Sequence, residues 1–178
     1  AVQILLAGIA CNLSYVELFA LAAWLPFVGF GAVSVLMRAV NRATAKTKTW
    51  WRSGAACALT FGSLALLSDQ NYPMRSAGWL AAVAAMYVLV YVVRRAALLY
   101  AGNVMSVILV ALLCAWCGVS FNGTLVAIAA FGLIGFYGAG WLYRLWRGTG
   151  RVWNAMLVSS LTAAGSAGLL ALLSSDIA

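Results

Sequence analysis

Hydrophobic residues occur in long stretches along this chain, and short groups of charged or turn-forming residues separate the stretches. A helix that crosses a bilayer needs about 20 largely apolar residues, within a range of about 17 to 25. Six stretches fit that range. They are Tyr15–Met37, Trp51–Ser68, Ala77–Val93, Ala96–Val119, Thr124–Trp146 and Ala155–Ser174. The pattern predicts an all-α integral membrane protein with about six transmembrane helices, forming one polytopic domain over residues 1–178.

The N-terminal region holds more apolar residues than one span needs. Residues 1–14 precede the first stretch as an apolar lead-in, and Pro26 lies within that stretch. Proline removes a backbone donor, and its ring clashes with the preceding helical turn. We therefore expect a first helix that is kinked at Pro26 and follows a lead-in helix on the outer surface. A short re-entrant pair is the alternative.

Composition supports a lipid environment. Hydrophobic residues make up 66% of the chain and charged residues 8%, whereas soluble domains average about 45–50% and about 25%. The mean hydropathy is +1.02. A soluble globule of 178 residues has a large share of its residues at the surface, so it cannot bury so many apolar side chains. A bilayer removes this difficulty because it solvates the apolar exterior.

The eleven basic residues are distributed unevenly between the two predicted sides. Ten of them fall into three alternate connections, and Arg75 is the only base on the opposite side. The ten are Arg38, Arg42, Lys46, Lys48, Arg52, Arg94, Arg95, Arg144, Arg147 and Arg151. Cytoplasmic loops of membrane proteins carry such an excess. The distribution therefore predicts a basic cytoplasmic loop at residues 38–52 and both termini on the outer, periplasmic side of a bacterial inner membrane.

The same alternation arranges the six helices as three consecutive hairpins, each turning through a basic loop. In a soluble protein the net charge of +8 would suggest nucleic acid. Here the bases stand at helix ends, so we expect anionic lipid head groups as their partners and no nucleic acid.

Four tryptophans lie next to basic residues at predicted helix ends. They are Trp50, Trp51, Trp146 and Trp153. The amphipathic indole ring favours the head-group region of a bilayer. We therefore expect these residues to anchor the chain at the membrane interface.

Three polar residues inside apolar stretches are candidates for an intramembrane polar site. Glu17 is the only acid in such a stretch, and Asn103 and Ser106 lie one turn apart in another. An ionisable group in a membrane is costly and marks a functional site by default. For Asn103 and Ser106 the alternative is a hydrogen bond that joins two helices.

Catalytic and cofactor chemistry has little support in this sequence. The chain has no histidine, which removes imidazole metal ligands and histidine-dependent catalysis. Cys114 and Cys117 form a CxxC motif, but a metal site needs more than two ligands and a thioredoxin-like redox site needs its own fold. We expect a protein that is not an enzyme and has no cofactor and no metal.

The function expected from these features is that of a non-catalytic inner-membrane subunit of a larger assembly for secretion, conjugation or export. The small-residue faces of several helices favour other membrane subunits, or copies of the chain itself, as partners. A small transporter, channel or substrate-binding membrane component is one alternative. A holin-like pore-former, or an immunity or exclusion protein, is another.

Overall fold

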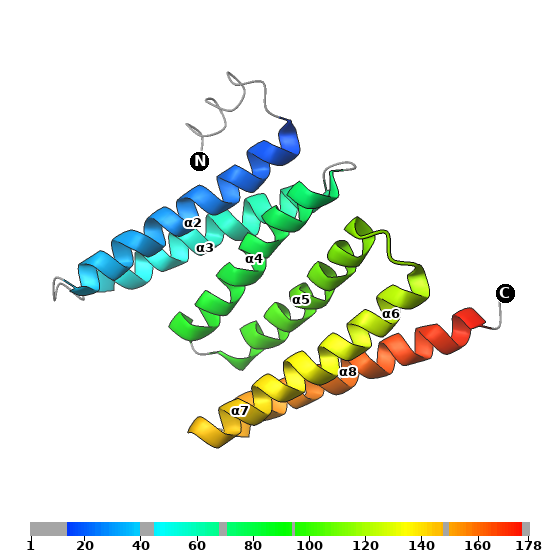
Figure 1. The fold of residues 1–178 in the computed structure, drawn as a ribbon. Coiled ribbons are helices and arrows are strands. Elements are labelled where there is room, and N and C mark those ends of the chain that lie inside the picture. Colours follow the sequence, from blue (N-terminus) through cyan, green and yellow to red (C-terminus); the bar gives the residue numbers. More distant parts are fainter. Residues whose placement is uncertain (1–13, 40–44, 68–70, 94, 148–149, 176–178) are drawn as a thin grey trace. The chain divides into compact units, whose positions relative to one another are not determined.

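A computed structural model describes residues 14–39, 45–67, 71–93, 95–147 and 150–175 (Figure 1). Within these ranges all the regular structure is helical. The elements are α2 (Tyr15–Ala39), α3 (Ala45–Leu67), α4 (Tyr72–Val93), α5 (Ala96–Trp116), α6 (Phe121–Ala130), η1 (Phe131–Tyr137), α7 (Gly138–Arg147) and α8 (Gly150–Ser175). The predicted all-α class is confirmed.

Five helical segments in the described ranges are long and apolar enough to cross a membrane. They are Tyr15–Leu36, Tyr72–Val93, Ala96–Trp116, Phe121–Leu145 and Gly150–Ser174. The predicted second span is also helical, as part of α3, but its apolar stretch from Gly54 to Leu67 is short for a crossing. The first part of α3 carries Lys46, Lys48 and Arg52 instead.

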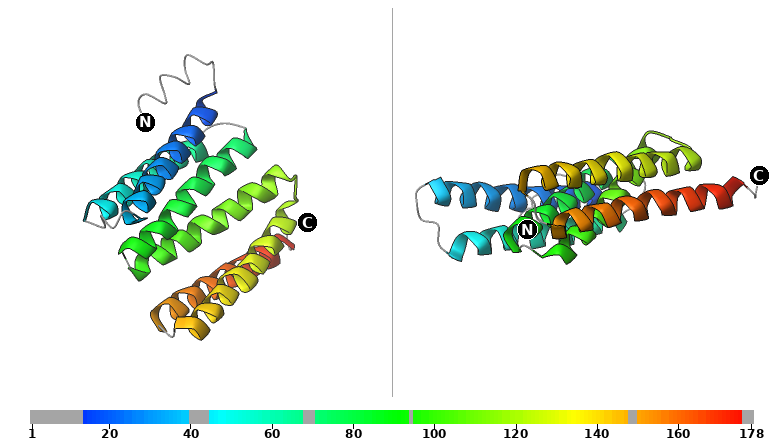
Figure 2. Two further views of the ribbon diagram at one scale, coloured as in Figure 1. Left: turned by 60° about the vertical axis from the view of Figure 1, so that its left-hand side comes forward. Right: turned by 90° about the horizontal axis from the view of Figure 1, so that it is seen from below.

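The helices form two compact units, residues 1–94 and residues 95–178, which we call the first and second units. Each contains three mutually packed rods: α2, α3 and α4 in the first, and α5, the continuous α6–η1–α7 rod and α8 in the second (Figures 1 and 2). The predicted arrangement as three hairpins is not confirmed, because α4 and α5 fall into different units.

Small residues bring the backbones of the first unit together. A Cβ atom added to Gly62 of α3 would lie 2.6 Å from the carbonyl oxygen of Gly78 and 2.8 Å from the Cβ of Ala82, both on α4. One added to Gly78 would lie 2.6 Å from the Cβ of Ala65. Close approach at small residues is a main source of helix association in lipid. The α3–α4 contact therefore depends on glycine at these two positions.

A hydrogen bond also joins the first and third helices of this unit. The indole nitrogen of Trp24 on α2 donates to the carbonyl oxygen of Ala77 on α4, at 2.8 Å. The Trp24 ring also makes an edge contact with Phe27, whose ring is buried in the same core. This tryptophan thus stabilises the interior of the unit.

In the second unit, α8 packs along the α6–η1–α7 rod, and the two run side by side in Figure 2. A Cβ added to Gly132 would lie 2.9 Å from the Cβ of Ala163, and one added to Gly140 would lie 2.7 Å from the Cβ of Met156. Phe136 is buried between these two glycines along the rod. The three residues, spaced four apart, form the face of the rod that packs against α8.

The middle of this rod, η1, is a π-helix of seven residues. An α-helix has 3.6 residues per turn, so each step of four residues overshoots one turn by about 40°. A π-helix has an i→i+5 bond and holds more residues per turn, so a four-residue step does not overshoot. The π segment therefore keeps Gly132, Phe136 and Gly140 on one side of the rod.

Helix boundaries differ from the predicted loops at several places. The expected loop 38–52 is largely helical, because α2 continues to Ala39 and α3 begins at Ala45. The helix α2 also continues through Pro26, which does not start a new element. The lead-in, residues 1–13, and residues 40–44 lie outside the described residues.

The end of α5 comes three residues before the predicted Val119, and the backbone shows why. Gly118 has a φ of 68°, a left-handed conformation that favours glycine. Its N–H donates to the carbonyl of Ala115 at 3.1 Å, and that of Val119 donates to the carbonyl of Cys114 at 2.9 Å. This pair of bonds is a Schellman motif, which ends the helix.

Candidate functional site

The most polar interior site of the second unit surrounds Asn103 on α5. Its side chain is 1% exposed. The amide nitrogen donates to the hydroxyl oxygen of Ser159 on α8 at 2.8 Å, and it lies 3.5 Å from the sulfur of Met156. The bond joins two apolar helices, so it both satisfies the amide and holds α5 against α8.

A groove of about 250 Å³ opens beside this hydrogen bond. Asn103, Ser159, Thr162 and Ser166 supply its polar groups, and Phe136 reaches it from the π segment. The remaining lining is aliphatic or aromatic and comes from Tyr100, Val104, Val107, Ile108, Val158 and Ala163. The groove can take an apolar group and offer it a few hydroxyl partners. Its lining includes no aspartate, glutamate, lysine or arginine, and Tyr100 adds a phenol hydroxyl.

Ser106, the second predicted polar residue, is buried but does not line the groove. Its hydroxyl donates to the carbonyl oxygen of Gly102 on the same helix at 2.9 Å. Serine hydroxyls in helices often bond to the preceding turn in this way. Ser106 therefore lies one turn from the Asn103 site.

Glu17, the third candidate, belongs to the first unit and begins α2. Its carboxylate accepts hydrogen bonds from the backbone N–H and from the hydroxyl of Ser14, both at 2.8 Å. Ser14 directly precedes α2, and Glu17 is the third residue of that helix. The backbone bond is that of a capping box, which satisfies a donor at the helix start. The structure gives Glu17 a local structural partner in the first unit, whereas Asn103 belongs to the second.

Most of the basic side chains that the structure describes are exposed. Arg52, Arg95, Arg144 and Arg151 are exposed. Arg42 and Arg94 lie outside the described residues, as do the side chains of Arg38, Lys46, Lys48 and Arg147. Arg75, the base on the opposite predicted side, is half-buried and donates to the carbonyl oxygen of Leu66 at 2.7 Å. It thereby satisfies an acceptor in the last turn of α3.

The predicted interface tryptophans lie in different surroundings. Trp50 is 37% exposed and its ring stacks near Phe30. Trp51 is half-buried, with ring atoms close to Gly31 and an edge contact with Phe27. The Trp153 ring makes an edge contact with Tyr137, and the guanidinium of Arg144 lies 5.5 Å from the indole centroid. The side chain of Trp146 lies outside the described residues.

The cysteines form no metal site within the described ranges. Cys57, Cys114 and Cys117 are free thiols, and Cys117 is exposed. Among the described residues no three histidine, cysteine or acidic side chains gather closely enough to hold a metal ion.

Sequence reasoning missed Ser159, the partner of Asn103. Serines on apolar helices commonly bond to their own backbone, as Ser34 and Ser166 do here. Ser159 does lie on a repeat of small residues spaced four apart, with Ala155, Ala163 and Ala167, and the burial of those alanines shows that this repeat was a usable signal. The capping role of Glu17 did have a signal, because Ser14 and Glu17 have the S-x-x-E spacing of a capping box.

The Asn103–Ser159 bond predicts an energetic coupling between α5 and α8. A double-mutant cycle measures this coupling as a difference in the free energy of unfolding. We expect about 0.6 kcal/mol from Asn103→Ala, Ser159→Ala and the double variant, with about 1.7 kcal/mol as the upper bound for such bonds in membranes. Unfolding titrations in mixed micelles measure it. Ser106→Ala combined with Ser159→Ala is the control and should be additive. Full additivity for Asn103 and Ser159 as well would contradict the role given to the bond.

Comparisons with protein-family models, with curated proteins and with solved structures find no match to this chain. What the sequence and structure define is a class: an all-helical chain whose long apolar helices are compatible with an integral membrane protein.

Proposed function

We propose that this chain is a non-catalytic, polytopic membrane subunit of a larger multi-protein assembly, of the kind that serves secretion, conjugation or export. The observation that carries the proposal is the exposed side of α8. Six residues on it are spaced alternately four and three apart, and all six are exposed. They are Asn154, Val158, Leu161, Gly165, Gly168 and Leu172, which we call the α8 seam.

The spacing of the α8 seam is that of a helix–helix contact. Apolar or small residues repeating every 3.5 positions face a partner helix in a left-handed pair. The seam lies opposite the buried side of α8, where Ala155, Ala163 and Ala167 face the core of the second unit. A Cβ added at Gly165 or Gly168 would meet nothing within 4 Å. Helix association in lipid uses small residues to bring backbones close, so these glycines suit a partner helix.

A tagged chain purified from its native membrane in mild detergent tests the proposal. We expect wild-type protein to recover defined membrane proteins at a fixed ratio. Gly165→Trp places a large ring in the α8 seam and should lower that recovery by about tenfold or more, which corresponds to about 1.4 kcal/mol. Val126→Trp is the matched control, because Val126 is 67% exposed on α6, and it should recover partners like wild type.

Photocrosslinking from position 165 provides the outcome that would contradict the proposal. A probe there that labels only lipid, in a chain that elutes as a monomer, would contradict the assembly. A probe that labels only further copies of the chain would favour the holin-like alternative.

For the topology we propose six crossings, made by the five long apolar helices and by α3. Both termini then lie on the periplasmic side of a bacterial inner membrane. Support comes from the charge distribution and from Arg75, since the one base on the outer side is bonded to the end of α3. The bases on the inner side then meet anionic lipid head groups.

A second candidate function is a small transporter, channel or substrate-binding component. The groove beside Asn103 favours it, because hydroxyl and amide groups gather there between apolar helices. The π segment also supplies Phe136 to the groove, and π segments often occur at functional sites. Saturable binding of a small solute by the purified monomer would favour this candidate over the assembly subunit.

A further inference from the structure

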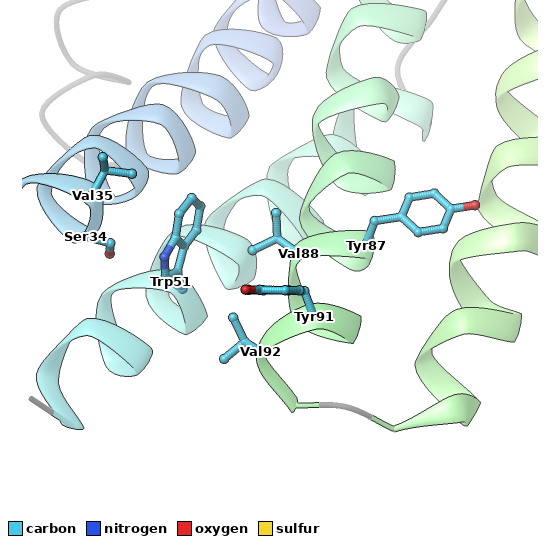
Figure 3. A pocket seen from close by; sticks show the side chains of 7 residues that line it. All are labelled: Ser34, Val35, Trp51, Tyr87, Val88, Tyr91 and Val92. Atoms are coloured by element: carbon cyan, nitrogen blue, oxygen red, sulfur yellow. The ribbon is translucent and has the colours of Figure 1, made fainter. Parts of the chain in front are cut away.

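Another groove lies in the first unit, near the end of α2, the start of α3 and the end of α4. It has a volume of about 320 Å³ and is lined by residues of all three helices of the unit. These are Ser34 and Val35 of α2, Trp51 of α3, and Tyr87, Val88, Tyr91 and Val92 of α4 (Figure 3). The volume is at the small end of the range for ligand pockets.

Most of the surface that lines this groove is apolar. The hydroxyl of Ser34 donates to the carbonyl oxygen of Phe30 at 2.8 Å. Figure 3 shows the Tyr91 ring extending toward Trp51, whereas Tyr87 points to the opposite side. Val88 lies above the Tyr91 ring and Val92 below it in the same view. Such a surface suits a hydrocarbon chain.

One exposed base directly follows a residue that lines the groove. It is Arg52, which comes after Trp51 on α3. In the sequence, Arg38 comes four residues after Ser34, and Arg94 comes two residues after Val92. Basic pockets between helices on the cytoplasmic side bind phospholipid head groups. The groove is therefore apolar inside, and it has an exposed arginine next to it in the chain.

We propose that this groove binds one anionic phospholipid, with part of an acyl chain between Trp51 and the α4 side chains and the phosphate near Arg52. A partner protein helix is the weaker fit, because a groove of about 320 Å³ is too small for a helix of about 10 Å diameter. The proposal rests on the orientation and the lipid contact proposed above, and it does not depend on the assembly function.

Native mass spectrometry of the full chain released from detergent micelles is the test. Phosphatidylglycerol and phosphatidylcholine with identical acyl chains are titrated in parallel. Wild type is expected to retain one phosphatidylglycerol at least about fivefold more tightly, from about 1 kcal/mol per base near the head group. Arg52→Gln should remove most of this preference and leave phosphatidylcholine binding unchanged. Arg151→Gln, which removes an exposed base of the second unit, is the matched control and should behave as wild type.

A variant that fills the groove distinguishes binding of the acyl chain from binding of the head group. Val35 is 61% exposed, and Val35→Trp should lower the retention of both lipids, whereas Val126→Trp should not. Equal retention of the two lipids by wild type overturns the proposal, as does an unchanged preference in Arg52→Gln. Equal losses in Arg52→Gln and Arg151→Gln also overturn it, since they show a general effect of charge. Arg52→Gln alters only an exposed side chain, so it decides the case if Val35→Trp does not fold.

Discussion

Replacing Gly62 with leucine is expected to lower the free energy of unfolding by about 3 kcal/mol, at the upper end of the usual cost of overpacking. The new side chain would begin 2.6 Å from the carbonyl oxygen of Gly78 and 2.8 Å from the Cβ of Ala82. Neither neighbour is the end of a flexible side chain, because one is helical backbone and the other is fixed directly to it. The two helices must therefore separate, which removes the close contact that holds α3 to α4.

Unfolding of the purified protein in mixed micelles, followed by circular dichroism, measures this loss. Gly29→Leu is the matched control on α2, because a Cβ there meets nothing within 4 Å. It should be neutral or slightly stabilising, since leucine forms helices better than glycine. Similar losses in the two variants would show that helix packing at Gly62 is not the cause.

Inserting one alanine after Ile134 in the π segment is expected to destabilise the second unit by about 3 kcal/mol, a large effect for a change of one residue. The π segment already holds the extra residue that keeps Gly132 and Gly140 on one side of the rod, and a further residue turns the following part of the rod by about 100°. Gly132 and Gly140 then no longer face α8 together. Either Ala163 or Met156 must lose its close contact with the rod.

Deleting Ile134 is the control. It places Gly132 and Gly140 seven residues apart, which is two turns of an α-helix to within about 20°, so both still face α8. Ile134 is 78% exposed, so losing its side chain should change the stability by no more than about 0.5 kcal/mol. Thermal unfolding of the two variants beside wild type gives the comparison. An insertion variant as stable as wild type would mean that the π segment does not align the rod.

Hydrophobic length was sufficient to predict the rods but not their ends. The helices α4 and α8 each begin five residues before the predicted Ala77 and Ala155, at Tyr72 and Gly150. The prediction treated Arg75 and Arg151 as loop residues. A charge disfavours the hydrocarbon region, but it does not disfavour the helix, so the backbone continues past it.

The grouping into two three-helix units was beyond sequence reasoning, which had paired neighbouring helices. In lipid all apolar surfaces are similar, so close packing at small residues and hydrogen bonds between helices select a partner. Gly62, Gly132 and Gly140 have such fits, whereas Gly165 meets nothing within 4 Å. Spacing along the sequence does not distinguish these cases.

The candidate site was predictable in part. Asn103 stood out as an amide in an apolar stretch, and it does join two helices through Ser159. Glu17 stood out for its charge, yet its charge is engaged at a helix start by Ser14. A rare polar residue marks a place where a partner is needed, and only the fold shows whether the partner is local or distant.

The positions of the tryptophans have a spectroscopic consequence. Trp79 is 6% exposed and Trp24 is bonded to α4, whereas Trp116 and Trp141 are 53% and 50% exposed. A quencher dissolved among acyl chains reaches only the outer rings directly, so intrinsic emission contains a shielded and an accessible part. Loosening of the first unit would appear as growth of the accessible part, before any change in helix content.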